Sequence, residues 1–537
     1  MSKNNPRTYL LTAFLLAAIM PALGQAWLDY DQALTNYPLL HTTNAAGLTT
    51  FTPRDSSQLL MGDARVGIST GHGQLKHPGS STHEWSAQAC VRSIYRLSRR
   101  TVVRGSMDYC YNWRRLDGGS VWIDPERMPF DITETNDSTL GNSSLETYHL
   151  NGELGINVGR GFSLGAQFDY TTASGAKKKD PRHINSLMLC KAGAGALWQH
   201  GRLTLGANYL FERSTEALRF STVGRTDQVY LYLIDNGAFF GREETTDGNG
   251  YVGSEYERPL LDISHGMAWQ AQYRQGAWSA GIEGEWHHRH GHYGLESPAH
   301  LDFNRHNGDR WKLWSWWQHV SGKTLQRLVL SLEHHQLKDY ERTYRIITDQ
   351  GVTDVNYYDD RLMGQSSTHT INVSGTAQWG LLRELAAWQL QAGLRHHRRT
   401  LTASLYPFYR QQQTHTTEAT LQGERNWLLP NDQTWSTRLL MGWSGGSGIP
   451  HHDGTYQAPD GNNIPPQGHI EHLMREYEYL TSKQLHLRAG VRWAIPLNHD
   501  RMRLYADADY HYSQAFNIHY LDNGYRHRMT LSLGCLF

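Results

Sequence analysis

Hydrophobic and polar residues alternate without interruption at the C-terminal end of the chain, over residues 525–537. Leu531 and Leu533 fall on one face of an extended strand, and Arg526 and Arg528 fall on the other. A strand with one apolar and one charged face fits between lipid on one side and water on the other. We therefore asked whether the same alternation recurs along the rest of the chain.

The alternation returns repeatedly from residue 62 onward. In one clear case, Leu164, Ala166 and Phe168 alternate with Gly165 and Gln167. Segments with this period of two predict strands that expose one face to an apolar environment. We predict about 18 such strands, near residues 62–72, 83–98, 101–115, 146–158, 162–173, 184–198, 202–214, 261–274, 277–289, 309–320, 324–337, 368–380, 385–399, 413–425, 433–445, 483–496, 500–513 and 524–537.

Short and long connections alternate between these segments. Short turns include residues 157–161 and 199–202, and long polar loops are predicted at about 116–145, 215–260, 338–367 and 446–482. Outer-membrane barrels have short periplasmic turns and long extracellular loops, and an even strand number returns both termini to one side. The fold class predicted for residues 61–537 is all-β: one closed transmembrane antiparallel barrel. A large soluble β-sandwich or propeller is the alternative, but it does not explain the loop asymmetry.

The N-terminal residues predict export. Residues 1–25 resemble a secretory signal peptide, with basic Lys3 and Arg7, an apolar run over residues 10–23 and a cleavage site near Gln25. Residues 26–60 show no sustained alternation, and we expect them to form a lead-in that is either periplasmic or lumenal. No later stretch has the roughly 18 apolar residues that a membrane-spanning helix needs. Export and membrane-spanning strands together predict the outer membrane of a Gram-negative cell.

The overall composition agrees with a barrel. The chain has 51 basic and 51 acidic residues, so no bulk charge attracts nucleic acid. A mean hydropathy of −0.60 is expected when only alternate strand residues meet lipid. The 18 tryptophans and 29 tyrosines suit aromatic belts at the membrane interfaces. Trp311, Trp314, Trp316 and Trp317 fall on both faces of one strand. We interpret them as residues of the aromatic belt, and an inward Trp that stacks on a sugar is the alternative.

The polar faces of the strands define what passes through the barrel. In the last three strands the predicted lumen-facing residues are Arg488, Arg492, Arg503, Asp507, Asp509, Arg526 and Arg528. A two-residue turn at 498–499 would place Arg488 opposite Asp509 and Arg492 opposite Tyr505. We expect Arg526 or Arg528 to reach the same acids from the final strand. Mixed charge argues against strong anion or cation selectivity.

Cys90 and Cys110 lie on the polar faces of neighbouring predicted strands. The inward-facing residues of both strands have even numbers, so the numbers of two opposed residues must add up to an even number. A three-residue turn at 99–101 makes this sum 200. That sum sets Cys90 opposite Cys110. The pair is a candidate disulfide, although opposed strand residues reach disulfide distance only with local strain. Two unpaired thiols are the alternative.

Other candidate sites are weaker. Histidines cluster at residues 287–292, but no carboxylate or Cys is interleaved to complete a metal site, so we interpret them as a solvated loop. Lysines at residues 177–179 are interpreted as a solvated loop tip, with lipopolysaccharide phosphate as the alternative contact. No P-loop and no H-E-x-x-H motif is present. No cofactor, metal or catalytic residue is predicted.

Three loop segments carry a family resemblance. They are NAAGL at residues 44–48, GGSVWIDPERMPFDI at 118–132 and KKDPRH at 178–183. Together with the barrel pattern they resemble an uncharacterised family of outer-membrane β-barrel proteins found in Bacteroidota, which implies no catalytic residues. The terminal Phe537 resembles the aromatic signal that such barrels present to the barrel assembly machinery.

These observations favour a channel or transporter for small polar solutes of unknown identity. A non-conducting scaffold or accessory subunit of an outer-membrane assembly is the first alternative, and a barrel enzyme is the second. The expected partners are outer-membrane lipid, lipopolysaccharide, the barrel assembly machinery and an outer-membrane protein of unknown identity.

Overall fold

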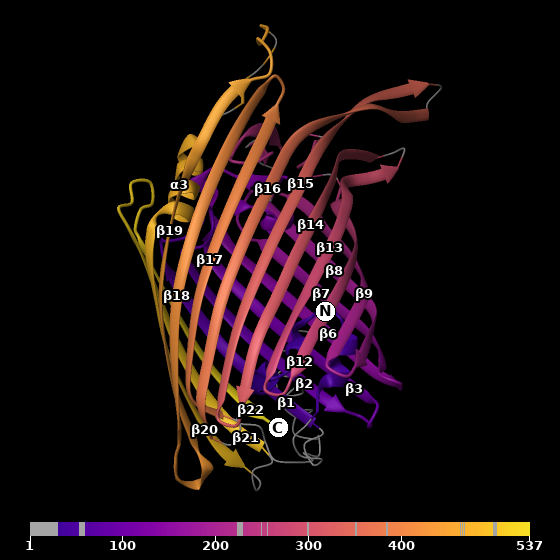
Figure 1. The fold of residues 1–537 in the computed structure, drawn as a ribbon. Coiled ribbons are helices and arrows are strands. Elements are labelled where there is room, and N and C mark those ends of the chain that lie inside the picture. Colours follow the sequence, from indigo (N-terminus) through magenta and orange to yellow (C-terminus); the bar gives the residue numbers. More distant parts are fainter. Residues whose placement is uncertain are drawn as a thin grey trace, which may run out of the picture.

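Hydrogen bonds between the first and last strands close the main sheet into a barrel (Figure 1). The computed structural model describes residues 30–52, 60–222, 229–248, 250–254, 256–297, 300–349, 352–382, 385–461, 463, 465–466, 468–497 and 502–537. At the junction, Gly62 donates its N–H to the Phe537 carbonyl at 2.8 Å, and Phe537 donates to the Gly62 carbonyl at 3.1 Å. The ring contains 18 antiparallel strands, which confirms the predicted fold class and the predicted pairing of the two ends.

Every predicted strand has a counterpart in the ring, and neighbours follow chain order. The barrel strands are β1 Leu60–Gly73, β2 His83–Arg96, β3 Thr101–Asp117, β6 Gly141–Gly159, β7 Phe162–Lys177, β8 Arg182–His200, β9 Leu203–Ser221, β12 Arg258–Gln275, β13 Trp278–Ser297, β14 His300–Ser321, β15 Thr324–Asp349, β16 Val352–Leu382, β17 Leu385–Leu405, β18 Phe408–Leu428, β19 Thr434–Thr455, β20 Lys483–Leu497, β21 Met502–Phe516 and β22 Tyr525–Leu536.

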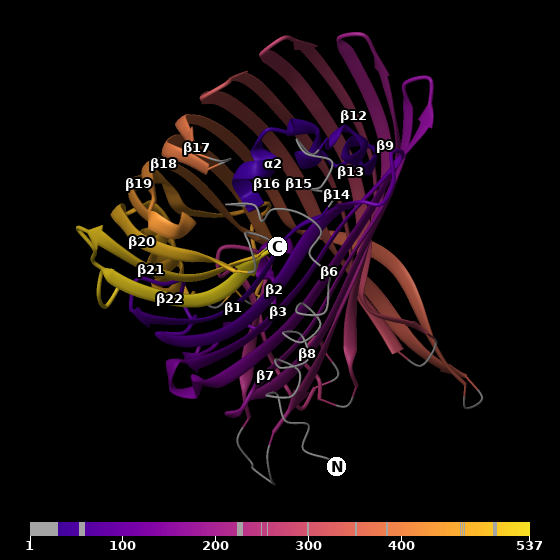
Figure 2. The same ribbon diagram turned by 90° about the horizontal axis from the view of Figure 1, so that it is seen from below.

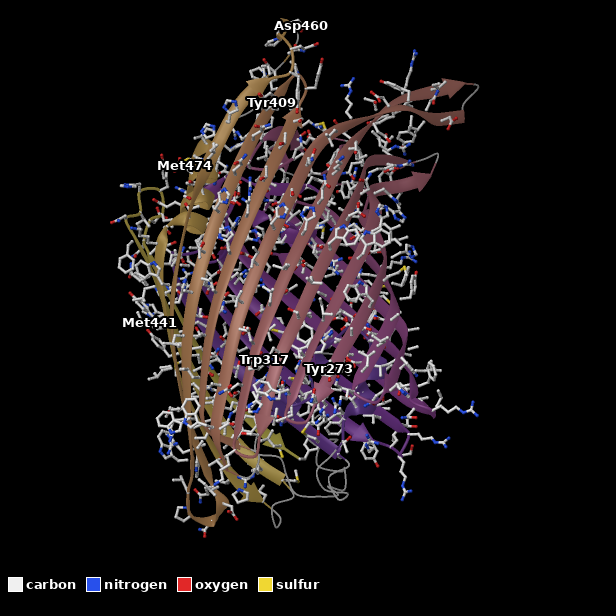
Figure 3. The ribbon with its side chains drawn as sticks, viewed as in Figure 1. Tyr273, Trp317, Tyr409, Met441, Asp460 and Met474 are labelled. Carbon is white, nitrogen blue, oxygen red and sulfur yellow. The ribbon has the colours of Figure 1, made fainter. Side chains whose placement is uncertain are left out.

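Aromatic side chains mark two levels on the outside of the barrel. Tyr273 and Trp317 lie near the short-turn end (Figure 3), where the Trp317 ring packs 4.9 Å from that of Trp278. On β19, the outward-facing Trp435 and Trp443 are eight positions apart. That spacing is about 27 Å along a strand and about 20 Å across a membrane once strand tilt is included. The two levels therefore match the girdles of a lipid-embedded band.

Several strands continue well beyond this band. The predicted loop at 338–367 is wrong, because β15 and β16 stay paired up to Asp349 opposite Val352 and flare away from the barrel (Figure 1). The histidines at 287–292 likewise belong to β13 and not to a loop. Above the lipid, water meets both faces of a strand, so the alternation disappears while the backbone ladder continues.

The helical segments are short. They are α2 Tyr30–Thr35, η1 Pro38–His41, η2 Ala45–Thr50, η3 Pro125–Arg127, η4 Asp137–Thr139, η5 Pro430–Asp432 and α3 Ile470–Thr481. Within the described residues, none of the helices is long and apolar enough to cross a membrane.

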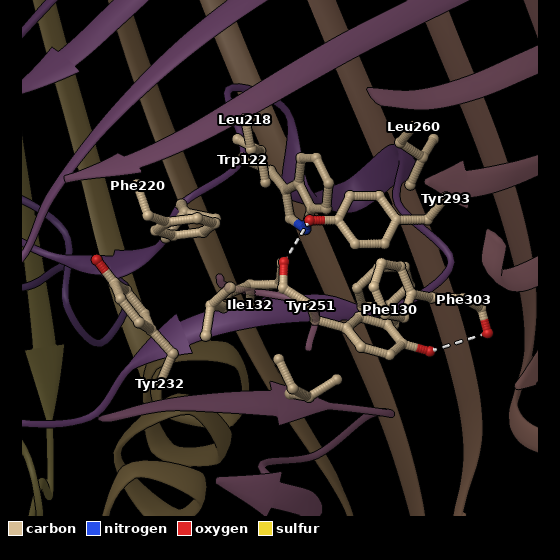
Figure 4. Close-up of a cluster of buried hydrophobic side chains, with 13 residues drawn as sticks. Trp122, Phe130, Ile132, Leu218, Phe220, Tyr232, Tyr251, Leu260, Tyr293 and Phe303 are labelled. Carbon is tan, nitrogen blue, oxygen red and sulfur yellow. Dashed lines mark hydrogen bonds between the residues drawn. The ribbon is translucent and has the colours of Figure 1, made fainter. Parts of the chain in front are cut away.

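A second sheet covers the long-loop end of the barrel. Its order is β11-β10-β5-β4, with β4 Gly119–Ser120 and β5 Asp131–Glu134 from the loop after β3, and β10 Leu231–Asp235 and β11 Gly241–Thr245 from the loop after β9. We call this sheet and its connecting residues the lid. Between the lid and the barrel wall lies an aromatic cluster (Figure 4). Phe130 of the lid packs 5.3 Å from Tyr293 of β13, whose hydroxyl donates to the Tyr251 carbonyl at 2.8 Å.

The described part of the lead-in, residues 30–52, lies inside the ring at the short-turn end, as the view from below shows (Figure 2). Its apolar side chains Tyr30, Leu48 and Phe51 are buried against β1, β2, β3 and β20 to β22. The lid and the lead-in are thus two internal bodies, one at each end of a continuous wall.

Candidate functional site

Glycines on the inner wall form a cradle for the lead-in. A Cβ atom at Gly165 of β7 would lie 2.0 Å from the backbone nitrogen of Ala46. At Gly195 of β8 it would lie 2.5 Å from the Asn44 side-chain oxygen. Because no larger residue fits at either position, the absence of side chains lets the lead-in backbone touch the wall.

Hydrogen bonds hold the later half of the lead-in, around residues 43–49, against the barrel wall. Asn44 donates from Nδ2 to the Ala196 carbonyl at 3.0 Å and to the Gln270 side chain at 3.1 Å. Thr43 donates from its backbone N–H and from its hydroxyl to Glu283 Oε1, each at 2.8 Å. The segment around NAAGL is therefore bonded to β8, β12 and β13 together.

The earlier half of the lead-in is held differently. Both carboxylate oxygens of Asp31 in α2 accept from Arg92 of β2, at 2.7 and 2.9 Å. Arg92 also pairs with Asp63 at 3.0 Å and lies 4.7 Å from the ring centre of Tyr30. The Asp31 side chain remains 69% exposed, so α2 depends on one ion pair and on its buried apolar residues.

The lid spans the opposite mouth. At one edge, Gly118 donates its N–H to the Gly79 carbonyl in the connection between β1 and β2, at 2.7 Å. At its far tip, the Ala238 carbonyl accepts from the buried Arg410 of β18 at 3.2 Å. The neighbouring Phe239 packs with Leu473 of α3 and stacks on His472 at 5.7 Å between ring centres. The lid thus joins widely separated strands.

Buried charges lie inside the lid contact. Lys177, at the end of β7, pairs with Glu134 of β5 at 2.5 Å, and both side chains are at most 2% exposed. The solvated interpretation of Lys177 is therefore wrong, because the lid folds over this loop. Asp235 lies opposite Asp131 in the lid sheet. Burial, together with Asp131, raises the pKa of Asp235 to about 7, although Asp235 accepts backbone hydrogen bonds from Gly237, Phe239 and Phe240.

The predicted lumenal charges of β20 and β21 form a ladder together with Arg438 of β19. Arg438 donates to Asp507 at 2.8 Å and to Asp509 at 3.0 Å. Arg492 donates to Asp507 at 2.8 Å, and Arg488 donates to Asp509 at 3.0 Å. Three guanidinium groups thus share two carboxylates.

The predicted register of these strands is wrong by two residues. Arg488 lies opposite His511, and Arg492 lies opposite Asp507. Four residues, 498–501, separate the paired ends Leu497 and Met502, so the connection is longer than the assumed two-residue turn. The shift keeps every side chain on its face, and Arg488 still reaches Asp509 diagonally.

The remaining predicted lumenal arginines have other partners. Arg526 and Arg528 pair with Glu84 of β2, at 3.2 and 2.6 Å, so the expected contacts to the acids of β21 are wrong. Arg503 is 2% exposed and donates to the Asp432 carbonyl at the short-turn end, at 2.8 Å. Phe537 occupies the last ladder position beside Gly62, and its role in assembly stays a prediction.

The predicted alignment of Cys90 with Cys110 is also wrong. Cys90 lies opposite Asp108, Cys110 lies opposite Gln88, and both thiols are free. The Ser98 hydroxyl accepts from the N–H groups of Arg100 and Thr101, each at 3.1 Å. This local hydrogen bonding accompanies a turn centred one residue earlier than assumed, which moves the register by two.

A polar cavity of about 400 Å³ lies between the lead-in and the inner wall of β15 to β20. Asp31 and Thr35 of the lead-in form one side. The wall contributes Glu424, four glutamines, Ser374, Thr376 and four arginines, which are Arg327, Arg438, Arg488 and Arg492. The cavity therefore combines two elements that the sequence pattern indicated separately, the lead-in and the charged lumen face.

One hydrogen-bonded cluster was missed by the sequence analysis. Ser444 of β19 bonds to His486 Nε2 at 3.0 Å, and His486 Nδ1 bonds to Ser513 at 2.9 Å. The signal was the G-x-S-x-G spacing at 442–446, but these residues continue a strand and make no strand-to-helix elbow. Among the described residues, no group of three or more His, Cys, Asp or Glu side chains is arranged to hold a metal ion.

Several solved outer-membrane proteins are similar to this chain at low sequence identity. The ferric preacinetobactin receptor BauA of Acinetobacter baumannii is 8% identical, with a TM-score of 0.40, over 89% of this chain and 80% of that one. The ferric-catecholate import receptor Fiu of E. coli K12 is 9% identical, with a TM-score of 0.40, over 90% and 82%. The outer membrane transporter YddB of Escherichia coli is 9% identical, with a TM-score of 0.39, over 88% and 81%.

The present chain is an outer-membrane barrel, given its closed ring of 18 strands and the aromatic girdles. No curated protein matches it. The segments on which the family resemblance rested lie in or beside the lead-in and the lid, which we call the two closures. Residues 44–48 lie in the lead-in, 118–132 in the lid and 178–183 next to the lid. A model described as a family of unknown function, DUF6850, matches residues 45–537, and the chain belongs to that family.

Proposed function

We propose that this protein is a gated outer-membrane channel or transporter for small polar solutes, closed in the conformation described here. The observation that carries the proposal is the polar cavity of about 400 Å³ between the lead-in and β15 to β20. Its lining of amides, hydroxyls, carboxylates and guanidinium groups suits a solute that exchanges hydrogen bonds with water. The lead-in lines one side of this cavity, and the lid covers the long-loop end of the barrel.

Both closures are suited to movement because neither belongs to the barrel ladder. Side-chain hydrogen bonds, ion pairs and apolar packing hold them to the wall, and each net hydrogen bond contributes about 1 kcal/mol. Releasing either body therefore costs several kcal/mol, a range that a binding partner or solute supplies through differential affinity. The ring of strands stays intact throughout.

Single-channel recording of the purified protein in planar bilayers tests this proposal. Gly165→Val removes space that Ala46 needs, and Phe239→Ala removes the aromatic anchor of the lid tip. Two substitutions serve as controls: Gly375→Val, where a Cβ meets nothing within 4 Å, and Tyr358→Ala, whose side chain is 67% exposed.

We expect rare openings from the unaltered protein and from both controls. The double variant Gly165→Val/Phe239→Ala should open steadily, because both ends are released. Heat-modifiable migration on gels would establish that each variant is folded. A folded double variant that stays silent would contradict the channel and favour a scaffold role.

A further inference from the structure

Most of the charged groups around the cavity make hydrogen bonds or ion pairs. Asp31 is held through both oxygens by Arg92. Glu424 accepts a hydrogen bond from Asn426 at 3.1 Å. The other cavity arginines, Arg438, Arg488 and Arg492, are all paired with acids of β21.

Arg327 of β15 is the exception. Its guanidinium group lies 5.8 Å from the ring centre of Trp314, and its Nε atom is buried without a hydrogen-bond partner. Across the part of the chain that the structure describes, no carboxylate pairs with Arg327. A cation in a partly desolvated site without a counterion is costly, and an anionic group placed beside it removes that cost.

The rest of the lining points to hydroxyl groups on the same solute. Gln378, Gln389, Gln391 and Gln422 supply amides that each donate and accept hydrogen bonds. Of the lining acids, Asp31 comes from the opposite, lead-in side of the cavity.

We infer that the cavity binds a small polyhydroxylated solute with one carboxylate, such as a sugar acid, with the carboxylate at Arg327. This inference rests on the proposed function and names its solute class. A guanidinium group suits a carboxylate because two parallel N–H groups meet two oxygens. The glutamines then bind the hydroxyl groups, and neutral sugars of the same size lack the charged contact.

Equilibrium dialysis of the full-length protein in detergent tests the inference, because it measures binding whatever the rate of entry. The probes are labelled glucuronate and labelled glucose, which differ in one carboxylate. Arg327→Gln is the test variant. Arg528→Gln is the matched control, since Arg528 is 52% exposed, pairs with Glu84 and does not line the cavity.

We expect the unaltered protein to bind glucuronate at least about tenfold more tightly than glucose, as one charge-assisted contact predicts. Arg327→Gln should remove that preference and leave glucose binding unchanged, whereas Arg528→Gln should retain it. Equal binding of the two sugars, or the same loss in both variants, would overturn the inference.

The single-channel recordings distinguish a failure of this inference from a failure of the proposed function. Steady conductance of the double variant without a glucuronate preference would overturn the solute class and leave the channel standing. A preference that depends on Arg327 in a protein whose double variant stays silent would support the binding site and contradict the channel.

Discussion

Replacement of Gly165 by Val should detach the lead-in while leaving the barrel closed. Gly165 belongs to β7, and its missing side chain provides the space that the backbone of Ala46 occupies. A valine Cβ would lie 2.0 Å from the Ala46 nitrogen, far inside van der Waals contact. A shift of β7 would break the hydrogen-bond ladder of the barrel, and a shift of Ala46 would break the contacts of the lead-in with the wall. Valine favours strand geometry, so the wall itself should tolerate the change.

The size of the effect follows from the contacts that hold residues 43–49. Thr43 makes two hydrogen bonds to Glu283, Asn44 makes two with Ala196 and Gln270, and Thr49 makes one with Ser163. At about 0.8 kcal/mol each, these five bonds contribute about 4 kcal/mol to docking. Exposure of the buried Leu48 removes about 2 kcal/mol more. The docked population should therefore fall by a factor of at least about one thousand.

Hydrogen–deuterium exchange of the folded protein measures this change directly. In the unaltered protein, the Thr43 N–H is bonded to Glu283 and the Gly47 N–H to the Asn44 carbonyl, so both amides should be protected. In Gly165→Val they should exchange at nearly the rate of a free peptide, whereas Gly375→Val should match the unaltered protein. Unchanged protection in a folded Gly165→Val variant would refute the claim that Gly165 provides the space for the lead-in.

Three further results are expected. Because the folded-state pKa of Asp235, about 7, lies above the ordinary value of about 3.9, lid docking should be strongest below about pH 4 and weaken as the pH rises through 7. Amides of β10, corrected for intrinsic rates, should then be less protected at pH 8 than at pH 5, and Asp235→Asn should abolish the difference; a slope that persists in this variant would assign it to another group. Asp507→Asn should lower the free energy of unfolding in urea by about 1–3 kcal/mol, since Arg438 and Arg492 both lose their shared carboxylate, and an unchanged value would show that the ladder contributes no stability. Non-reducing peptide mapping should recover Cys90 and Cys110 as separate thiols. A disulfide-linked peptide would mean that the two strands pair in the register that sets Cys90 opposite Cys110.

The alternation of the sequence was enough to predict the strands and their faces. Lipid outside and water inside impose a period of two, so residues such as Leu533 and Arg528 are assigned without knowledge of their neighbours. The same period leaves register undetermined by multiples of two, because a slip of two residues exposes the same faces. Both register errors, at Cys90 and at Arg488, have this size. Turn geometry decides between the alternatives, and turn lengths were assumed.

The two closures could not be predicted because they depend on contacts between distant segments. Strands β4 and β10 have two and five residues and become a sheet only when two separate loops meet. The cradle depends on the absence of a side chain at Gly165. In the sequence alone, a glycine at this position indicates only a weak strand residue, because nothing shows that Ala46 packs against it. Lys177 is likewise expected to be solvated until Glu134 is placed over it.

The cluster around the lead-in also has a consequence for biogenesis. Leu48 and Phe51 pack with Met61 of the first strand and Leu536 of the last, so their complete contact surface is assembled when the two ends of the sheet meet. Seating of the lead-in is thereby coupled to completion of the barrel. A newly inserted molecule is therefore expected to seat its lead-in in the same step in which its wall closes.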